Sequence, residues 1–155
     1  MIVPVDLTNI DTAARIHAAA WQASHRTFCK PEFVEKHTPE RQKAYLQTKM
    51  DRGSAVYMLV ADQPAGIVSV TGNLIEDLYV LPEMQNRGCG TQLLRFAMAR
   101  CDETPVLWIL ENNENAARLY CRQGFAETGR RHTVTDGLDE IEFAWKGDPG
   151  GGESV

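Results

Sequence analysis

The sequence is short of the features that mark membrane proteins, metal sites and nucleic-acid binders. None of its apolar runs is long enough to span a bilayer, and its first residues lack the charged-then-apolar pattern of a signal peptide. Its 4 cysteines form no CxxC pair, and no His/Cys spacing resembles a zinc site. Runs of lysine or arginine are missing, and the formal net charge is −5. We therefore expect no membrane, no metal and no nucleic acid as partner.

What remains is the composition of an ordinary globular domain. The 155 residues are enough for one real hydrophobic core, and we expect a single domain over residues 1–146. The unpaired cysteines suggest a reducing compartment, hence a cytoplasmic protein. A mildly acidic surface suits cationic small molecules, although many enzymes with neutral substrates are equally acidic. The segment 147–155, GDPGGGESV, has nothing to bury, so we expect a disordered tail there.

Hydrophobic periodicity and turn residues predict a mixed α/β fold. Strands are expected at 2–6, 55–62, 66–72, 74–81, 105–110, 125–134 and 139–146. Helices are expected at 11–26, between Pro31 and about Arg52, at about 91–101 and at about 114–123. The predicted order is β-α-α-β-β-β-α-β-α-β-β, without internal repeats.

A glycine-containing turn separates an expected strand from the helix that follows it. Residues 81–94 read LPEMQNRGCGTQLL, with Gln85, Gly88 and Gly90 in a Q-x-x-G-x-G pattern. Unpaired N–H groups at a helix start bind phosphate, glycine lets the backbone approach it, and Arg87 adds a cation. The pattern is neither a P-loop nor a dinucleotide fingerprint. The turn therefore predicts a pyrophosphate site, with a ligand-free strand–helix connection as the alternative.

A second motif follows the expected central strand at 105–110. Residues 113–125 read NENAARLYCRQGF, which places Asn113, Ala116 and Tyr120 at N-x-x-A-x-x-x-Y spacing. Ala116 and Tyr120 are four residues apart and share one helix face. Gly124 marks the end of this helix.

Together these motifs resemble the GCN5-related N-acetyltransferase (GNAT) family. The resemblance rests on IEDLYVLPEMQNRGCG for the acetyl-CoA loop and on NENAARLYCRQGF for the second cofactor motif. The order of elements agrees from about residue 1 to 146. The resemblance implies a twisted mixed sheet, flanked by helices, whose two central strands splay apart to hold acetyl-CoA.

The resemblance also assigns cofactor-binding residues. Backbone N–H groups of the turn, with Thr91, would hold the pyrophosphate; the turn comprises Gln85, Asn86, Arg87, Gly88, Cys89 and Gly90. The backbone of Leu78 and Val80 would pair with the pantetheine arm like an added strand. Asn113 would bind the same arm. Cys89 stands where the family usually has a bulkier apolar residue, which affects packing more than chemistry.

Two catalytic candidates follow from the motifs. Tyr120 would donate a hydrogen bond to the departing thiolate and then reprotonate it; the alternative is a core aromatic residue. Glu76 and Asp77 interrupt an apolar strand, where alternation puts Glu76 on the face of Leu78 and Val80 and lets only one carboxylate enter the acceptor cleft. The pair matches family members that acetylate polyamines and amino sugars, in which this Glu is a proposed water-mediated base. Glu76 is thus a base, an amine-binding group or an idle carboxylate.

The first expected helix supplies candidate acceptor contacts. His17, Trp21 and His25 recur every four residues and share one face. By the resemblance this helix walls the acceptor site, so Trp21 and His25, with Asp77, are candidates for substrate binding. The alternative is a stripe that packs on the sheet.

These observations predict an acetyl-CoA-dependent N-acetyltransferase that transfers acetyl directly to a primary amine, without a metal or an acyl-enzyme. The expected acceptor is a small molecule resembling a polyamine, an amino sugar or an aminoglycoside. Two alternatives are a protein N-terminal or lysine acetyltransferase and a non-catalytic acyl-CoA-binding module. Family members often dimerise through terminal strands, so the resemblance also allows a homodimer.

Overall fold

The computed structural model describes residues 1–27, 29–135 and 137–147, and the tail expected to be disordered lies almost wholly outside these residues. The strands are β1 (Ile2–Pro4), β2 (Ala55–Val60), β3 (Pro64–Thr71), β4 (Leu74–Val80), β5 (Val106–Leu110), β6 (Phe125–Thr135) and β7 (Leu138–Trp145). The helices are α1 (Ile10–His25), α2 (Pro31–Glu35), α3 (Pro39–Asp51), the 3-10 turn η1 (Pro82–Met84), α4 (Cys89–Met98) and α5 (Glu114–Arg122). The expected order holds, except that the second helical region is divided into α2 and α3.

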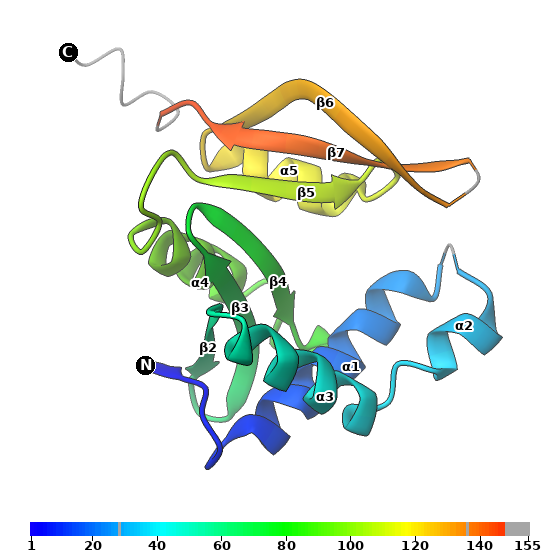
Figure 1. Ribbon diagram of the computed structural model, residues 1–155, viewed down its shortest axis with the longest axis vertical. Coiled ribbons are helices and arrows are strands. Elements are labelled where there is room, and N and C mark those ends of the chain that lie inside the picture. Colours follow the sequence, from blue (N-terminus) through cyan, green and yellow to red (C-terminus); the bar gives the residue numbers. More distant parts are fainter. Residues whose placement is uncertain (28, 136, 148–155) are drawn as a thin grey trace.

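The strands form one mixed sheet in the order β1-β2-β3-β4-β5-β7-β6. All neighbours are antiparallel except β4 and β5, which are parallel and lie at its centre. Figure 1 shows α1 and α3 on one side of the β2–β4 half, whereas α4 lies on the other side. The fold thus has two half-sheets joined at the β4–β5 pair.

The two central strands separate soon after they meet. Their register is a single pair, Leu74 with Val106, and the Val106 N–H also donates to the Asn73 carbonyl at 2.9 Å. Beyond Leu74 the rest of β4 is not registered with β5, and the two strands diverge in Figure 1. This confirms the mixed sheet with splayed central strands that the resemblance implied.

A β-bulge in β4 changes which side chains share a face. Ser69 pairs with Glu76, but Ile67 pairs with Tyr79, so β4 carries one extra residue between these pairs. Asp77 lies in this bulge with a left-handed φ of 55°, which a non-glycine residue adopts only at a cost. The expectation that Glu76 shares a face with Leu78 and Val80 is therefore wrong. The bulge interrupts simple alternation, and both Glu76 and Asp77 contact the α3 side of the sheet.

Two hydrophobic clusters cover the two faces of the sheet. The α4/α5 face is filled by β-strand residues packed on buried helical side chains such as Leu93, Leu94 and Tyr120. The opposite face is filled by α1 and α3 residues such as Ile10 and Leu46, packed on Ile67 of β3. The sheet thus separates the side that carries the glycine turn from the side that carries the first helices.

Gly66 provides a test of the close approach between β3 and its neighbours. A Cβ atom at Gly66 would lie 2.8 Å from Leu93 Cδ1 and 2.8 Å from the Tyr79 carbonyl oxygen. Gly66→Ala should therefore lower the free energy of unfolding by about 1–3 kcal/mol, because the strand must shift. Gly90→Ala is the control, since its Cβ would meet Leu119 at an ordinary 3.5 Å. Urea unfolding of both variants checks the prediction, and equal stabilities would contradict it.

Candidate active site

The turn between β4 and α4 presents an exposed, strained backbone at a helix start. Gly88 is the N-cap of α4 with a left-handed φ of 80°, and Asn86 has a φ of 63°. Residues 85–88 are exposed, and a Cβ at Gly88 would meet no atom within 4 Å. A glycine is therefore favoured at position 88 by its left-handed backbone and by the close approach that it allows. Crowding by neighbouring atoms is not the reason. The first N–H groups of α4 face a space in which an anion can be bound.

The two cofactor motifs come together on this side of the sheet. A Cβ at Gly90 would lie 3.5 Å from Leu119 Cδ2 and 3.9 Å from Val80 Cγ2, so α4, α5 and the end of β4 are in contact. Arg95 of α4 donates to the Gln123 side chain just after α5 at 2.8 Å. Cys89 is buried in the same cluster and Thr91 is half-buried. The two motifs, which are separated in the sequence, therefore form one continuous surface in the fold.

Asn113 has a structural role in addition to the one expected from the resemblance. It is the N-cap of α5, and its side-chain oxygen accepts from the Ala116 N–H at 3.2 Å. This cap fixes the start of the helix that carries Tyr120.

Tyr120 is buried on α5, with 7% of its surface exposed, near the ring of Phe125 at 6.0 Å. Burial raises the pKa of its hydroxyl, so the group stays protonated at neutral pH. Within the part of the chain that the structure describes, this hydroxyl has no hydrogen-bond partner. Tyr120 is thus available as a donor, as the motif predicts, although it is also part of the core.

A pocket of about 630 Å³ lies on the opposite side of the sheet from α4, between the first helices and the C-terminal strands. Its lining comes from α1, the α2–α3 region, β4, β5, β6 and β7, and it comprises His17, Trp21, His37, Arg41, Gln42, Tyr45, Leu74, Glu76, Asp77, Tyr79, Trp108, His132 and Glu140. Most of these residues are polar or aromatic. The carboxylate pair therefore lies in this pocket together with Trp21, but His25 does not line it.

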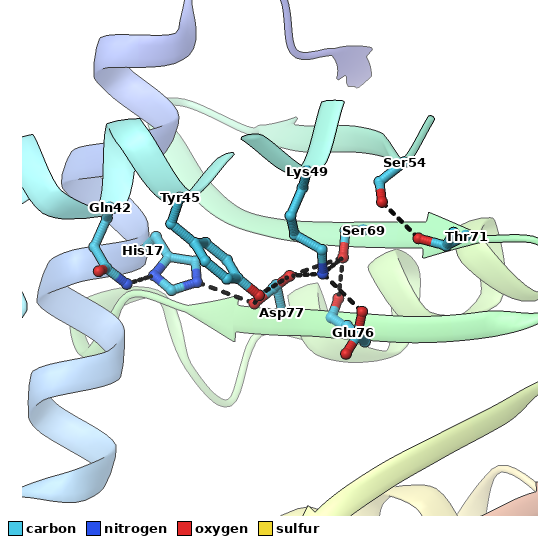
Figure 2. Close-up of polar contacts among 9 residues, drawn as sticks. All are labelled: His17, Gln42, Tyr45, Lys49, Ser54, Ser69, Thr71, Glu76 and Asp77. Atoms are coloured by element: carbon cyan, nitrogen blue, oxygen red, sulfur yellow. Dashed lines mark hydrogen bonds and ion pairs between the residues drawn. The ribbon is translucent and has the colours of Figure 1, made fainter. Parts of the chain in front are cut away.

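The carboxylate of Asp77 is the centre of a hydrogen-bond network in this pocket (Figure 2). Its Oδ1 lies 3.1 Å from His17 Nε2 and accepts from the Tyr45 hydroxyl at 3.0 Å. Its Oδ2 accepts from Ser69 Oγ at 2.9 Å and from Lys49 Nζ at 2.7 Å. Burial alone would raise the pKa of Asp77, but the His17 hydrogen bond and the Lys49 charge outweigh it and hold this pKa well below its usual range.

His17 supports Asp77 from α1. Its ring is buried, with Nδ1 against the Gln42 side-chain amide nitrogen and Nε2 against Asp77. The amide donates to Nδ1, so the hydrogen of a neutral ring lies on Nε2 and is donated to the carboxylate. The residues of the stripe on the first helix therefore differ in role, because His17 and Trp21 both line the pocket but only His17 contacts Asp77.

Lys49 links both carboxylates from α3. Its ammonium lies 2.7 Å from Glu76 Oε1, 2.7 Å from Asp77 Oδ2 and 3.2 Å from Ser69 Oγ, which satisfies its three donors. Burial would lower the pKa of Lys49, but the charge of Asp77 and the hydrogen bonds to Asp77 and Glu76 raise it. Glu76 keeps its second oxygen, Oε2, without a partner among the described residues, and its side chain is 43% exposed.

Trp21 lies in a stack of rings at the helical wall of the pocket. His25 stacks on it with ring centroids 3.9 Å apart, and His37 stacks on it at 3.5 Å. The Nδ1 atom of each imidazole faces a backbone carbonyl one helical turn earlier, that of Trp21 and that of Phe33 respectively. Burial lowers the pKa of both imidazoles, so both are neutral at pH 7. His25 thus stacks on Trp21 and does not line the pocket, and its contact with the acceptor stays a prediction.

Sequence reasoning missed the contribution of α3. Arg41, Tyr45 and Lys49 recur every four residues, the spacing that singled out the stripe on α1, so this signal was present. Trp108, His132 and Glu140 come from β5, β6 and β7, and no local pattern marks them as neighbours of α1. Among the described residues, His, Cys, Asp and Glu side chains form no group of three that could hold a metal. The described helices include none that could cross a membrane.

The sequence matches a protein family model and a curated relative. The family model of the acetyltransferase (GNAT) domain matches residues 53–127. The peptidyl-lysine N-acetyltransferase YjaB of Escherichia coli (strain K12) is 32% identical over 69 residues, which span 44% of this chain and 46% of that relative. The chain therefore aligns in sequence with about half the length of this curated relative.

Solved structures extend the likeness to nearly the whole chain. The solution structure of apo YjaB has a TM-score of 0.76 and 22% identity, covering 95% of this chain and 97% of that one. The coenzyme A complex of the PaiA N-acetyltransferase from Thermoplasma acidophilum has a TM-score of 0.70 and 18% identity, covering 94% and 98%. The structure of YncA from Salmonella typhimurium with its cofactor acetyl-CoA has a TM-score of 0.68 and 19% identity, covering 96% of this chain and 94% of that one. These likenesses confirm the expected fold.

The network around Asp77 predicts a pH-dependent contribution to stability. Asp77→Asn should lower the free energy of unfolding by about 3–5 kcal/mol at pH 7, because it breaks a buried ion pair. Since the pKa of Asp77 is lowered in the fold, this stability is present above the unfolded pKa of about 3.9 and is lost as the pH falls below it. The difference from wild type should therefore shrink when urea unfolding is repeated at stepwise lower pH.

Glu76→Gln is the matched control for Asp77→Asn. It removes the other carboxylate that Lys49 contacts, but the half-exposed Glu76 should contribute only about 1 kcal/mol or less. Equal losses in the two variants, or a loss in Asp77→Asn that persists at low pH, would contradict the assignment of Asp77 as the centre of the network.

Proposed function

Residues 53–127 belong to the GNAT acetyltransferase domain family, and on this premise we propose that the protein is an acetyl-CoA-dependent N-acetyltransferase acting on a primary amine. The observation that carries the proposal is the split between β4 and β5. It has the exposed glycine turn on one side and the pocket with the carboxylate pair on the other. A cofactor and an amine can therefore reach the same gap from opposite faces of the sheet.

The residues around the split suit acetyl-CoA, which supplies the acetyl group as a thioester. The N–H groups of residues 85–91 would hold the pyrophosphate at the positive end of α4, with Arg87 as a nearby cation. The backbone of Leu78 and Val80 would pair with the pantetheine arm along the part of β4 that β5 leaves. Asn113 would contribute at the start of α5.

Glu76 would bind the acceptor amine. Lys49 holds Oε1, whereas Oε2 belongs to a half-exposed carboxylate that lines the pocket, so one oxygen is left for an ammonium group. Of the three roles expected for Glu76 from the sequence, amine binding is the one that requires nothing beyond this oxygen. Freeing an amine with a pKa of about 10.4 at pH 7 costs about 4–5 kcal/mol, and burial of the amine in the pocket would reduce this cost by lowering its pKa. Asp77 would position Glu76 indirectly, because the two share Lys49.

Tyr120 would stabilise the charge that develops on the leaving sulfur. It lies on α5 in the hydrophobic cluster that also includes Val80 at the end of β4. The raised pKa keeps this phenol protonated, so it donates a hydrogen bond to the developing thiolate, and any proton that it gives to the sulfur must be replaced as it leaves. Solvent then restores the phenol.

We favour a small-molecule acceptor, because the pocket is bounded by the first helices and by the β6–β7 strands. The second candidate is a lysine side chain of a protein, since the relative YjaB is a peptidyl-lysine N-acetyltransferase. Thiol release measured with a panel of small amines and with lysine-containing peptides separates the two. A homodimer stays a prediction, which the molar mass in solution would test.

The cofactor assignment predicts that CoA binds at the glycine turn. Gly88→Val should weaken CoA binding by at least about tenfold, because a β-branched residue resists the left-handed φ and fills the approach to the N–H groups. Calorimetric titration with CoA checks this, with Gly53→Val as control because Gly53 also has a positive φ but lies between α3 and β2. Folded wild type without affinity for CoA would overturn the proposed function.

Tyr120→Phe tests the donor role. The variant removes one hydrogen bond to a developing anion, which typically costs about 3 kcal/mol, or 10²–10³ in turnover. The loss should fall on kcat and spare the KM for acetyl-CoA, and it should shrink with an acyl donor whose thiol is more acidic. Near-wild-type turnover, with chemistry shown to be rate-limiting, would leave Tyr120 as a core aromatic residue. Wild type that binds CoA but releases no thiol with any amine would favour the acyl-CoA-binding module.

A further inference from the structure

Arg41 and Tyr45 on one face of α3 line the acceptor pocket with polar groups, and Lys49 lies on the same face beyond the residues that line the pocket. Arg41, Tyr45 and Lys49 are four residues apart, so they lie one above the other along the helix. Lys49 and Tyr45 both contact the carboxylates of β4, and the Lys49 ammonium also lies 5.3 Å from the centre of the Tyr45 ring. Arg41 lines the same pocket two helical turns from Lys49.

Arg41 differs from the neighbouring cations of α3 in having no counter-ion. Lys43 pairs with Asp11 at 2.9 Å, and Lys49 pairs with Glu76 and Asp77. No carboxylate of the described residues pairs with the Arg41 guanidinium, in a protein whose net charge is −5. Arg41 also lies in the first turn of α3, where the helix dipole disfavours a cation. Helix stability therefore does not account for this charge.

The pocket thus has two ends of opposite charge. Glu76 Oε2 is the anionic end beside the β4–β5 split, and Arg41 is the cationic end at the start of α3. Lys49, which contacts Glu76, is eight residues after Arg41, so the two ends are about 12 Å apart at the helix backbone. The other carboxylates of the pocket have partners of their own, because Asp77 pairs with His17 and Lys49 and Glu140 pairs with His132 at 2.9 Å.

We propose that the acceptor is a primary amine whose far end carries an anionic group, a carboxylate or a phosphate, bound by Arg41. This inference rests on the proposed acetyltransferase function and names its substrate class. The ammonium group contacts Glu76 at one end, and the guanidinium binds the anion bidentately at the other. An α-amino acid is too short, because its two charges are on one carbon. Extended ω-amino acids and amino-sugar phosphates instead carry their two charged groups several bonds apart.

The reaction conserves atoms and charge for either source of the anion. The bound ammonium gives one proton to water, and the amine's lone pair forms the new C–N bond at the thioester carbonyl. The C–S bond then breaks, and the sulfur receives a proton from Tyr120, which recovers it from the nitrogen of the new amide by way of solvent. The anionic end is unchanged, so Arg41 acts in binding alone.

Two matched pairs of acceptors test the proposal in the full-length protein. One pair is 6-aminohexanoate and hexylamine, and the other is glucosamine 6-phosphate and glucosamine. Wild type should prefer the anionic member of at least one pair by about tenfold or more in kcat/KM, the size expected for a charge-assisted bidentate contact. The pair that shows the preference identifies a carboxylate or a phosphate as the bound group.

Variants at the two ends of the pocket should have different effects. Arg41→Gln should abolish the preference by lowering kcat/KM for the anionic member much more than for the neutral member, and Arg41→Lys should keep part of it. Glu76→Gln should lower kcat/KM for both members alike. Lys43→Gln, which removes a charge from the same helix outside this pocket, should leave the preference intact. Thermal unfolding of each variant checks that the fold is retained.

The outcomes separate this inference from the proposed function. Transfer to neutral amines without any preference, or a preference that Arg41→Gln leaves intact, overturns the inference alone. Transfer only to lysine-containing peptides also overturns it and selects the protein acceptor. Wild type that transfers acetyl to no amine or peptide overturns the proposed function and the inference together.

Discussion

An ionised carboxylate buried in a sheet must be surrounded by hydrogen-bond donors, and the structure of the acceptor side follows from this need at Asp77. With 8% of its side chain exposed, Asp77 cannot rely on water. Its donors come from α1 through His17, from α3 through Tyr45 and Lys49, and from β3 through Ser69. These contacts fix the first helices against β4, and Figure 2 shows them converging on one residue.

The bulge connects this network with the split in the sheet. A left-handed residue in β4 breaks the regular pleat, and the strand leaves β5 after a single registered pair. The network around Asp77 offsets the cost of that conformation. The two half-sites therefore use different means of recognition. Backbone groups dominate at the glycine turn, the proposed site of a common cofactor, whereas side chains dominate in the pocket, the proposed site of the ligand that must be selected.

The sequence was sufficient to predict the fold, including the strand–turn–helix at which the proposed cofactor site lies, because these depend on local signals. Glycine, proline and periodicity mark the strand–turn–helix around Gly88, and the helix face of Tyr120 follows from spacing. The acceptor side could be predicted only in part. Alternation assigned the wrong face to Glu76, since a bulge depends on contacts of Asp77 with α1 and α3 that are distant in sequence. His17 was noticed for its spacing, but its partner Gln42 was not, because that contact is tertiary.

The distribution of the two half-sites along the chain has an evolutionary consequence. The glycine turn and α5 lie within residues 53–127, the segment that the family model matches, whereas α1, α3, His132 and Glu140 lie outside it. Substitutions in the two ends of the chain can thus change the acceptor while the cofactor machinery is inherited intact. Relatives that share the central segment need not share a substrate, and divergence of their specificity should be sought in the first helices and the last hairpin.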